Sequence, residues 1–382
     1  MANFPQGALD VGTAEQAAAA AKVLQSVPEL AVDVEADSMH AFRARLCFVQ
    51  VGTDEDVFLF DTLAPGVTLE GLKPLLQDPA KTKFFHAAGG DLQYLAEAGI
   101  RVRGLFDTHR AATLLGWPKV GLADLARERL SVTLLKEHQQ SDFSLRPLPE
   151  GMRAYIADDV RYLSEIGRQV RAACEQADIL EEVLLDCQRM CEDAAGRPEI
   201  APFRPKIPRA LPPAERAFQH GAAQALHAKR LLWAERANLP MGRLLSNAAL
   251  TELLTRPPPN LDRMKRVPGI RGSFVRDHGE ETLAILTELK GRAESGTLTN
   301  LAEETTRDPN CRKREEALKE FRSAKAVERR VTSSVVLPNS LIESLAKTPP
   351  VSLEELGRIP FLGEKRLKLY GRELVALLNS LQ

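Results

Sequence analysis

The sequence predicts a mixed α/β domain with helices on the faces of its sheet, followed by two small all-helical bundles. Three observations predict this fold class. Apolar stretches rich in Val, Phe and Leu alternate with short polar turns near the start, a proline-rich segment interrupts the chain near its middle, and the remainder repeats itself once. With 382 residues, the chain is also longer than one hydrophobic core usually organises, so two or three domains are expected.

The elements of the first domain follow from the spacing of its apolar residues. Short apolar runs with β-branched and aromatic residues predict strands at 30–37, 45–52, 56–63 and 82–88. Helical spacing predicts helices at 69–77 and 90–99 and an almost wholly helical chain from there to about residue 190. Three sequential strands, followed by strand and helix alternation, indicate a mixed sheet covered by helices.

Two segments divide the chain into domains. Residues 197–213 carry six prolines, which cannot continue a helix or a central strand, and residues 291–310 are polar and break the helical pattern. We therefore predict a first domain at 1–196, helical domains at 214–290 and 311–382, and linkers between them.

The two helical domains are predicted to be copies of each other. Residues 226–286 align with residues 318–378 at a constant offset of 92, without a gap. The alignment places Arg230 on Arg322, and it also matches prolines, glycines and apolar positions. Because such residues fix turns and core faces, both copies should form the same helical bundle.

Charge is distributed unevenly along the chain. Residues 1–200 hold 20 basic and 31 acidic side chains, a net charge of −11, whereas the remainder carries +10. This asymmetry favours a cation-binding centre beside a surface that binds a polyanion. Two differently solvated surfaces would give the same count.

Composition excludes several classes of protein. An apolar fraction of 44% and a charged fraction of 27% are those of a globular protein, not of a fibrous or disordered one. No run of about 18 apolar residues and no basic leader occur, so we expect a cytoplasmic protein without a membrane partner. The absence of a G-x4-G-K-[S/T] loop excludes a helicase remnant. The five cysteines form no C-x-x-C pair and are predicted to be reduced structural thiols: Cys47, Cys174, Cys187, Cys191 and Cys311.

Three groups of residues could carry chemistry. Asp33 and Glu35 lie two apart on a predicted strand, so both carboxylates project from one face. Asp91 lies in the first turn of a predicted helix, and Tyr155 and Asp159 lie at i and i+4 on one face of a later helix. Each pattern alone is common in structural roles, but their joint occurrence in this order is specific.

This combination resembles a known family. V-D-V-E at Asp33 and Glu35, H-x4-D ending at Asp91, and Y-x3-D from Tyr155 to Asp159 are similar to the three motifs of tyrosine-type DEDD 3′→5′ exonucleases. The resemblance to ribonuclease D continues through 107–116, 121–130 and 141–148, with Phe143 where Trp is common, and the repeats resemble paired HRDC nucleic-acid-binding domains. It implies an α/β exonuclease domain with a ribonuclease H-like mixed sheet and flanking helices, followed by two HRDC-like helical bundles.

The resemblance also implies an activity. It is that of a 3′→5′ exoribonuclease releasing nucleoside 5′-monophosphates from RNA 3′ ends by two-metal-ion hydrolysis. Two divalent cations, Mg²⁺ or Mn²⁺, about 3.5–4 Å apart, would neutralise charge on the attacking water, the phosphorus and the leaving oxygen. Such ions prefer carboxylate ligands.

The family assigns a role to each site residue. Asp33 would bridge the two ions, Glu35 and Asp159 would complete the site of one, and Asp91 would support the other. Tyr155 would orient the attacking water, because its usual pKa of about 10 makes it a poor general base. The expected partners are RNAs with a free 3′ end, such as tRNA precursors and small structured RNAs, with no obligate protein partner.

Further side chains are candidates for contact with nucleic acid. They are His86, Gln50 and Arg45 in the first domain and Arg266, Arg271, Lys365 and Arg366 in the repeats. Ordinary surface or structural roles stay open for all of them. Two other functions also stay open: a DNA 3′→5′ exonuclease, because contacts to the 2′-hydroxyl are not visible in a sequence, and a non-catalytic nucleic-acid-binding adaptor. The complete set of carboxylates argues against the adaptor.

Overall fold

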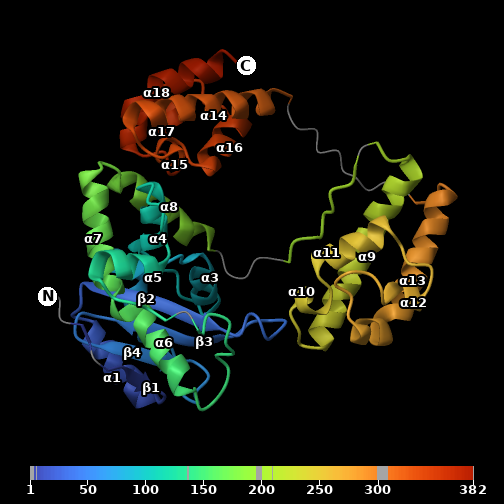
Figure 1. Ribbon diagram of the computed structural model, residues 1–382. Coiled ribbons are helices and arrows are strands. Elements are labelled where there is room, and N and C mark those ends of the chain that lie inside the picture. The colour runs from blue at the N-terminus through green and yellow to red at the C-terminus, as the bar shows by residue number, and fades with distance from the viewer. Residues whose placement is uncertain are drawn as a thin grey trace. The chain divides into compact units, whose positions relative to one another are not determined.

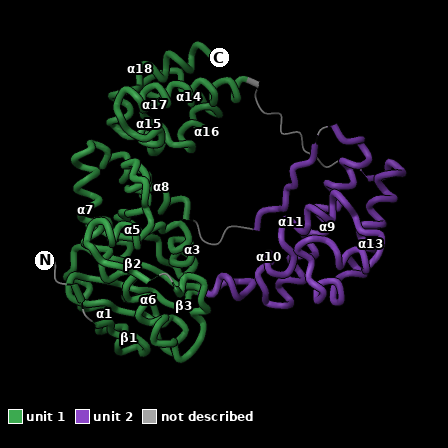
Figure 2. Tube along the Cα trace, viewed as in Figure 1, with its two compact units in different colours: residues 1–36, 46–197, 306–382 green, residues 37–45, 198–305 purple. Residues whose placement is uncertain are grey.

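The computed structural model describes residues 4–5, 7–135, 137–194, 200–208, 210–298 and 309–381 (Figure 1). The chain divides into two compact units (Figure 2). The first contains residues 1–36, 46–197 and 306–382, and the second contains residues 37–45 and 198–305. Residues 197–199, 209 and 299–308, which belong to the two predicted linkers, lie outside the described residues.

A six-stranded mixed sheet lies in the first unit, in the order β1-β4-β3-β2-β5-β6. Its strands are β1 (Leu9–Val11), β2 (Glu29–Ala36), β3 (Leu46–Gly52), β4 (Val57–Asp61), β5 (Thr82–Phe85) and β6 (Leu105–Asp107). The β2–β3 and β3–β4 pairs are antiparallel, and the β1–β4, β2–β5 and β5–β6 pairs are parallel. The four predicted strands are confirmed. β1 and β6 were not predicted, because three residues are too few to show the alternating pattern of a strand.

Helices cover this sheet, and together they form the sheet domain. They are α1 (Ala14–Leu24), α2 (Lys73–Gln77), α3 (Gly89–Glu97), α4 (Thr108–Leu114), α5 (Leu122–Leu125), the π-helical turn η1 (Ala126–Leu130), α6 (Glu150–Arg161), α7 (Leu163–Gln176) and α8 (Leu180–Asp193). The predicted helical run up to residue 190 is wrong where β6 lies. It is also wrong between η1 and α6, where the described residues form no helix or strand.

Helix α6 is seated directly over the middle of the sheet. It packs against β2, β3 and β4, and it contacts β3 at Gly52. A Cβ atom on Gly52 would lie 2.7 Å from the backbone oxygen of Val160. The absence of a side chain there therefore lets α6 approach the strand backbone, which brings residues of α6 close to those of β2.

Two helical bundles follow. The first bundle contains α9 (Pro213–Arg236), α10 (Met241–Leu244), α11 (Asn247–Thr255), α12 (Leu261–Met264) and α13 (Gly272–Glu294), and it lies in the second unit. The second bundle contains α14 (Pro309–Arg329), α15 (Ser333–Val336), α16 (Asn339–Lys347), α17 (Leu353–Gly357) and α18 (Glu364–Asn379), and it lies in the first unit. Helix α13 extends four residues into the segment predicted as a linker from residue 291.

The two bundles repeat each other in detail. Arg230 donates hydrogen bonds to the backbone oxygen of Leu245 and to the Asn247 side chain at 3.0 and 2.7 Å. The counterpart Arg322 donates to the Leu337 and Asn339 atoms at the same offset, at 3.1 and 2.8 Å.

Backbone conformation is also repeated. Left-handed residues occur at Asn238 and Arg330 (φ 47° and 55°) and at Gly269 and Phe361 (φ 81° and 60°). The predicted repeat with an offset of 92 is therefore confirmed. Among the described residues, no helix is both long and apolar enough to cross a membrane.

Candidate active site

Three predicted site residues converge over the centre of the sheet. Carboxylate oxygens of Asp33, Glu35 and Asp159 lie within 4.8 Å of one another, and each of these side chains is partly exposed. Within the described part of the chain, this is the one group of three or more acidic, His or Cys side chains that could hold a metal ion.

Two elements supply these three carboxylates. Asp33 and Glu35 are alternate residues of β2, so their side chains leave the same face of the strand, while Val32 and Val34 between them are buried. Asp159 comes from α6, which packs against β2. The strand period and the seating of α6 thus explain why residues more than 120 positions apart meet.

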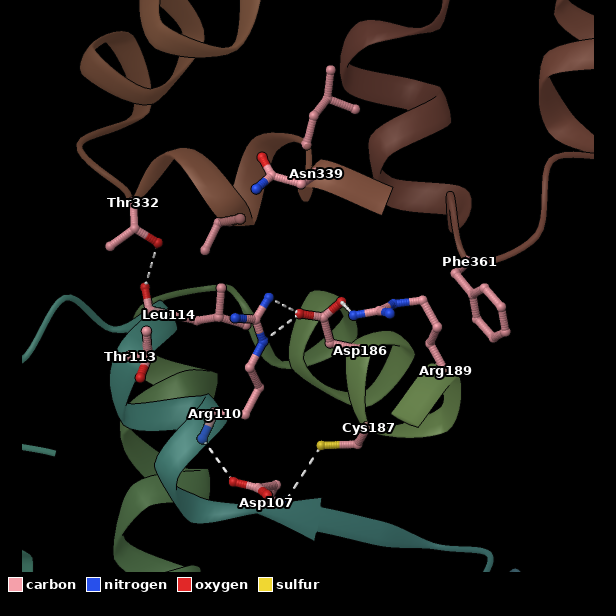
Figure 3. A network of polar contacts seen from close by, with 12 residues as sticks. Asp107, Arg110, Thr113, Leu114, Asp186, Cys187, Arg189, Thr332, Asn339 and Phe361 are labelled. Carbon is pink, nitrogen blue, oxygen red and sulfur yellow. Dashed lines mark hydrogen bonds and ion pairs between the residues drawn. The ribbon is translucent and has the colours of Figure 1, made fainter. Parts of the chain in front are cut away.

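Asp91 reaches the site from the first turn of α3. The turn that precedes α3 is held by the buried Asp107, whose carboxylate accepts hydrogen bonds from the backbone nitrogens of Ala87 and Ala88 at 3.3 and 2.7 Å. The same carboxylate accepts from the backbone nitrogen of Arg110 at the start of α4 (Figure 3). Ala87 has a φ of 63°, so the turn adopts a conformation that needs such support.

Burial raises the pKa values of all four carboxylates, and their mutual repulsion adds to the effect at Glu35, Asp91 and Asp159. Burial raises the pKa of Asp33 to about 7. Burial, and then the charges of Asp33, Asp159 and Asp91, raise the pKa of Glu35 to about 10. Burial and the Asp33 charge raise the pKa values of Asp91 and Asp159 well above their usual range. Asp91 lies outside the group within 4.8 Å. Its charge nevertheless raises the pKa of Glu35, and the charges of Asp33 and Asp159 raise the pKa of Asp91.

Tyr155 lies one helical turn before Asp159, and its hydroxyl donates a hydrogen bond to the Asp159 carboxylate. Burial and the neighbouring carboxylates, Asp159 foremost, raise the Tyr155 pKa above its usual value, so the hydroxyl keeps its proton at neutral pH. Its ring stacks on that of the buried Phe143, with 6.3 Å between centroids, and meets His138 edge-on at 6.1 Å. Phe143 therefore has a packing role.

Arg146 anchors the segment that carries Phe143. Its guanidinium donates to the Phe143 backbone oxygen at 2.8 Å and to both Asp61 carboxylate oxygens at 2.6 Å, which ties the segment to β4. Sequence reasoning did not find His138 or Arg146. Both lie in the irregular stretch between η1 and α6, where no periodic pattern marks a residue as buried or exposed.

Gln50 lies opposite Asp33 in the β2–β3 register. Directly paired residues of antiparallel strands project from the same face, so the Gln50 amide shares the site with Asp33. It is fully buried, and neither its Nε2 nor its Oε1 has a hydrogen-bond partner among the described residues. A buried amide without partners is unusual in a folded protein.

Comparisons with known proteins agree with this geometry. A family model described as a 3'-5' exonuclease matches residues 10–173, and the HRDC domain model matches residues 219–286 and 312–378. Ribonuclease D of Gluconacetobacter diazotrophicus is 32% identical over 276 residues, covering 72% of this chain and 69% of the relative. Ribonuclease D of Acidiphilium cryptum is 28% identical over 98% of this chain and 94% of its own.

The chain belongs to the ribonuclease D family. It is accordingly a metal-dependent 3′→5′ exoribonuclease, and the alternatives of a DNA exonuclease and a non-catalytic adaptor are not favoured. The crystal structure of Escherichia coli RNase D has the same fold, with a TM-score of 0.67 at 24% identity over 98% of this chain and 99% of that chain.

Two further candidates for RNA contact, His86 and Arg45, already interact with other side chains of this ribonuclease D family member. His86 Nδ1 lies 2.8 Å from Thr108 Oγ1, and burial, followed by the proximity of His109, lowers the His86 pKa to about 3. His86 is therefore neutral at physiological pH. Arg45 belongs to the second unit and pairs with the buried Asp37 at 2.9 Å, although its side chain is 61% exposed.

The candidates in the bundles fall into two groups. Arg266 and Arg271 of the first bundle are exposed. Arg366 of the second bundle is buried, donates to the backbone oxygens of Val335 and Phe361, and has its pKa lowered by burial. The prediction that Arg366 contacts nucleic acid is therefore wrong. Lys365 is largely buried against acidic residues of α8.

Proposed function

We propose that Asp33, Glu35, Asp91 and Asp159 hold two Mg²⁺ or Mn²⁺ ions and that the chain hydrolyses the terminal phosphodiester of RNA from the 3′ end. The observation that carries this proposal is the carboxylate group within 4.8 Å, with its raised pKa values. Oxygen donors without Cys or His suit these hard cations. A bound cation relieves the mutual repulsion of the carboxylates, so these residues are suited to hold the two divalent cations.

When bound, the ions supply Lewis-acid stabilisation of the charge that develops on the phosphate. The protein's own part is to hold the reactants in line. Tyr155 stays protonated, and its hydroxyl lies against the Asp159 carboxylate, which supports a role in orienting the attacking water rather than in removing its proton. The partnerless Gln50 amide, next to Asp33, supports a role in contacting the 3′-terminal nucleotide.

The substrates we propose are tRNA precursors and other small structured RNAs with a free 3′ end, and the products are nucleoside 5′-monophosphates. The ribonuclease D relatives and the two HRDC domains support RNA as the substrate class. The cytoplasm stays the predicted compartment.

A digest of end-labelled RNA tests polarity, metal requirement and substrate together. A 5′-labelled RNA should shorten in single-nucleotide steps with Mg²⁺ present, and a 3′-labelled RNA should release labelled mononucleotide first. EDTA should stop both reactions, and a DNA of the same sequence should be degraded more slowly. Hydrolysis that persists in EDTA, or internal cuts as the first products, would contradict the proposal.

A further inference from the structure

The two bundles differ in charge at one corresponding face. This turn face comprises residues 256–276 of the first bundle and residues 348–368 of the second. In the first bundle it contains six basic residues and one acidic residue, whereas in the second it contains four basic and three acidic residues. Five of these six basic side chains of the first bundle lie within α12, α13 or the turn between them, and all five are exposed: Arg263, Lys265, Arg266, Arg271 and Arg276. Lys265 and Arg276 also pair with the exposed Asp262 and Asp277.

In the second bundle, the part of the turn face at the start of α18 contacts the sheet domain. Lys365 Nζ lies 2.9 Å from the Asp178 carboxylate and 3.4 Å from that of Glu182. The Lys365 backbone nitrogen donates to the Glu181 carboxylate at 3.1 Å. The start of α18 is thus bound to the acidic first turn of α8 and to Asp178, two residues before that helix.

Neighbouring residues of the second bundle widen this contact. Arg329 lies 3.5 Å from the Glu182 carboxylate, so the buried Glu182 has two cationic partners from one bundle. The Thr332 hydroxyl donates to the backbone oxygen of Leu114 at 2.9 Å, beside the Arg110–Asp186 ion pair that links α4 to α8 (Figure 3). Val335 is fully buried in the hydrophobic core of the sheet domain.

One glycine shows that the contact depends on the sequence of the second bundle. Gly363 occupies the position before α18 that Arg271 occupies before α13. A Cβ atom on Gly363 would lie 2.4 Å from Leu185 Cδ1 and 2.6 Å from Glu181 Oε1, so a side chain there would require these two side chains of α8 to move, and the φ of 82° also favours glycine. The first bundle carries a long, exposed cation at the same place.

We propose that the two bundles have separate tasks: the turn face of the first bundle binds RNA phosphates, and that of the second docks on the sheet domain and takes no part in RNA binding. Phosphate binding requires exposed cations that release counterions. The turn face of the first bundle presents five of them, whereas Lys365 and Arg366 of the second make contacts within the protein. This division deepens the proposed function and depends on RNA being the substrate.

Matched double variants of the full chain test the division. Arg266→Ala with Arg276→Ala removes two exposed charges from the first bundle, and Arg358→Ala with Lys368→Ala removes two from the equivalent positions of the second. Binding of a hairpin RNA with a single-stranded 3′ tail is measured against salt in EDTA, which prevents hydrolysis. The first pair should weaken binding about tenfold and lower the slope of log K against log[salt] by about 2. The second should change neither.

The possible outcomes separate this inference from the proposed function. Equal losses for the two pairs, or a larger loss for the second, would overturn the division of tasks while leaving RNA binding intact. A wild-type chain that fails to bind the RNA would overturn both.

Hydrogen exchange of α8 tests the docking itself. Gly363→Arg gives the second bundle the residue of the first and should speed exchange in α8 at least tenfold, whereas the matched Arg271→Gly should leave it unchanged. Lys365→Met removes the ion pairs without altering the turn and should act in the same direction as Gly363→Arg. Unchanged α8 exchange in both Gly363→Arg and Lys365→Met would refute the docking.

Discussion

Asp33 is the residue through which the acidic side chains of the site are coupled. Its charge raises the pKa of Glu35, of Asp91 and of Asp159. Because the Asp33 carboxylate repels each of the other three carboxylates, a cation bound to it would reduce the repulsion in the whole group. The order and spacing of the motifs predicted these residues. The sequence could not predict that three of them lie within 4.8 Å and that Asp91 stands apart.

Asp33→Asn should abolish hydrolysis and, in EDTA near pH 8, leave the protein at least as stable as the wild type. The substitution removes a charge that its neighbours repel, without changing the size of the side chain. Activity and melting temperature are measured with and without Mg²⁺, and the stabilisation by Mg²⁺ should shrink in the variant. Activity within about tenfold of wild type would remove Asp33 from the metal site, since even outer-shell residues matter by 10–100-fold.

Gln50→Leu should raise the stability of the protein and lower its activity. Leu removes a buried amide whose unmade hydrogen bonds cost about 1–3 kcal/mol, so the variant should unfold at a higher denaturant concentration. RNA turnover should fall, because the amide lies beside Asp33. Lower stability with unchanged turnover would assign Gln50 a structural role instead.

Elements with a regular apolar pattern were predictable, and irregular ones were not. The four predicted strands share near-continuous apolar runs, whereas β1 and β6 are too short to show a pattern. α1 is alanine-rich, and its start is marked only by the capping box of Thr13 and Gln16. The stretch between η1 and α6 is fixed by tertiary bonds, such as those of Arg146 to Asp61, which local sequence does not reveal.

Strand β5 carries a second feature that the sequence hides. Lys83 is fully buried in the strand, and its ammonium group donates to the backbone oxygens of Asp78 and Lys81, which closes the turn before β5. Burial lowers its pKa from 10.5 to about 8. The penalty for burying the charge is therefore complete below about pH 8 and disappears as the pH rises toward 10.5.

Stability measured against pH should reveal this lysine. The unfolding free energy of the wild type, relative to that of Lys83→Met, should rise by about 2 kcal/mol between pH 7.5 and 10, because one pKa unit corresponds to about 1.4 kcal/mol. Taking the difference cancels the titration of other groups. The exposed Lys22→Met is the matched control. A difference that stays flat over this range would mean that Lys83 is charged at pH 10 in the folded protein.

At the scale of the whole molecule, the repeat was predictable but the unequal use of its copies was not. Side chains at one constant offset were enough to predict two similar bundles. The docking of the second bundle depends on the acidic first turn of α8. In the sequence, this turn resembles the ordinary solvent-exposed start of a helix. The contacts group the second bundle with the sheet domain in one compact unit.

Truncation after Lys206 tests this joint unit. The shortened chain keeps all four site carboxylates and Tyr155, so it should still hydrolyse single-stranded RNA at saturating concentration. It should bind structured RNA more weakly, with a flatter salt dependence. Loss of the second bundle exposes the core around Val335 and leaves Glu182 without its two cations, so the melting temperature should fall by about 4 °C or more. An unchanged melting temperature would show that the sheet domain does not need the bundle.

The position of Lys365 in the chain has a consequence for biosynthesis. Its partners on α8 are made early, 183 residues before it in the case of Glu182. Because a chain is made from its N-terminus, α8 leaves the ribosome before Arg329 and Lys365 do. The acidic first turn of α8 is therefore uncovered while the residues between Glu182 and Lys365 are being added, which makes the docking of the second bundle a late step in the folding of the enzyme.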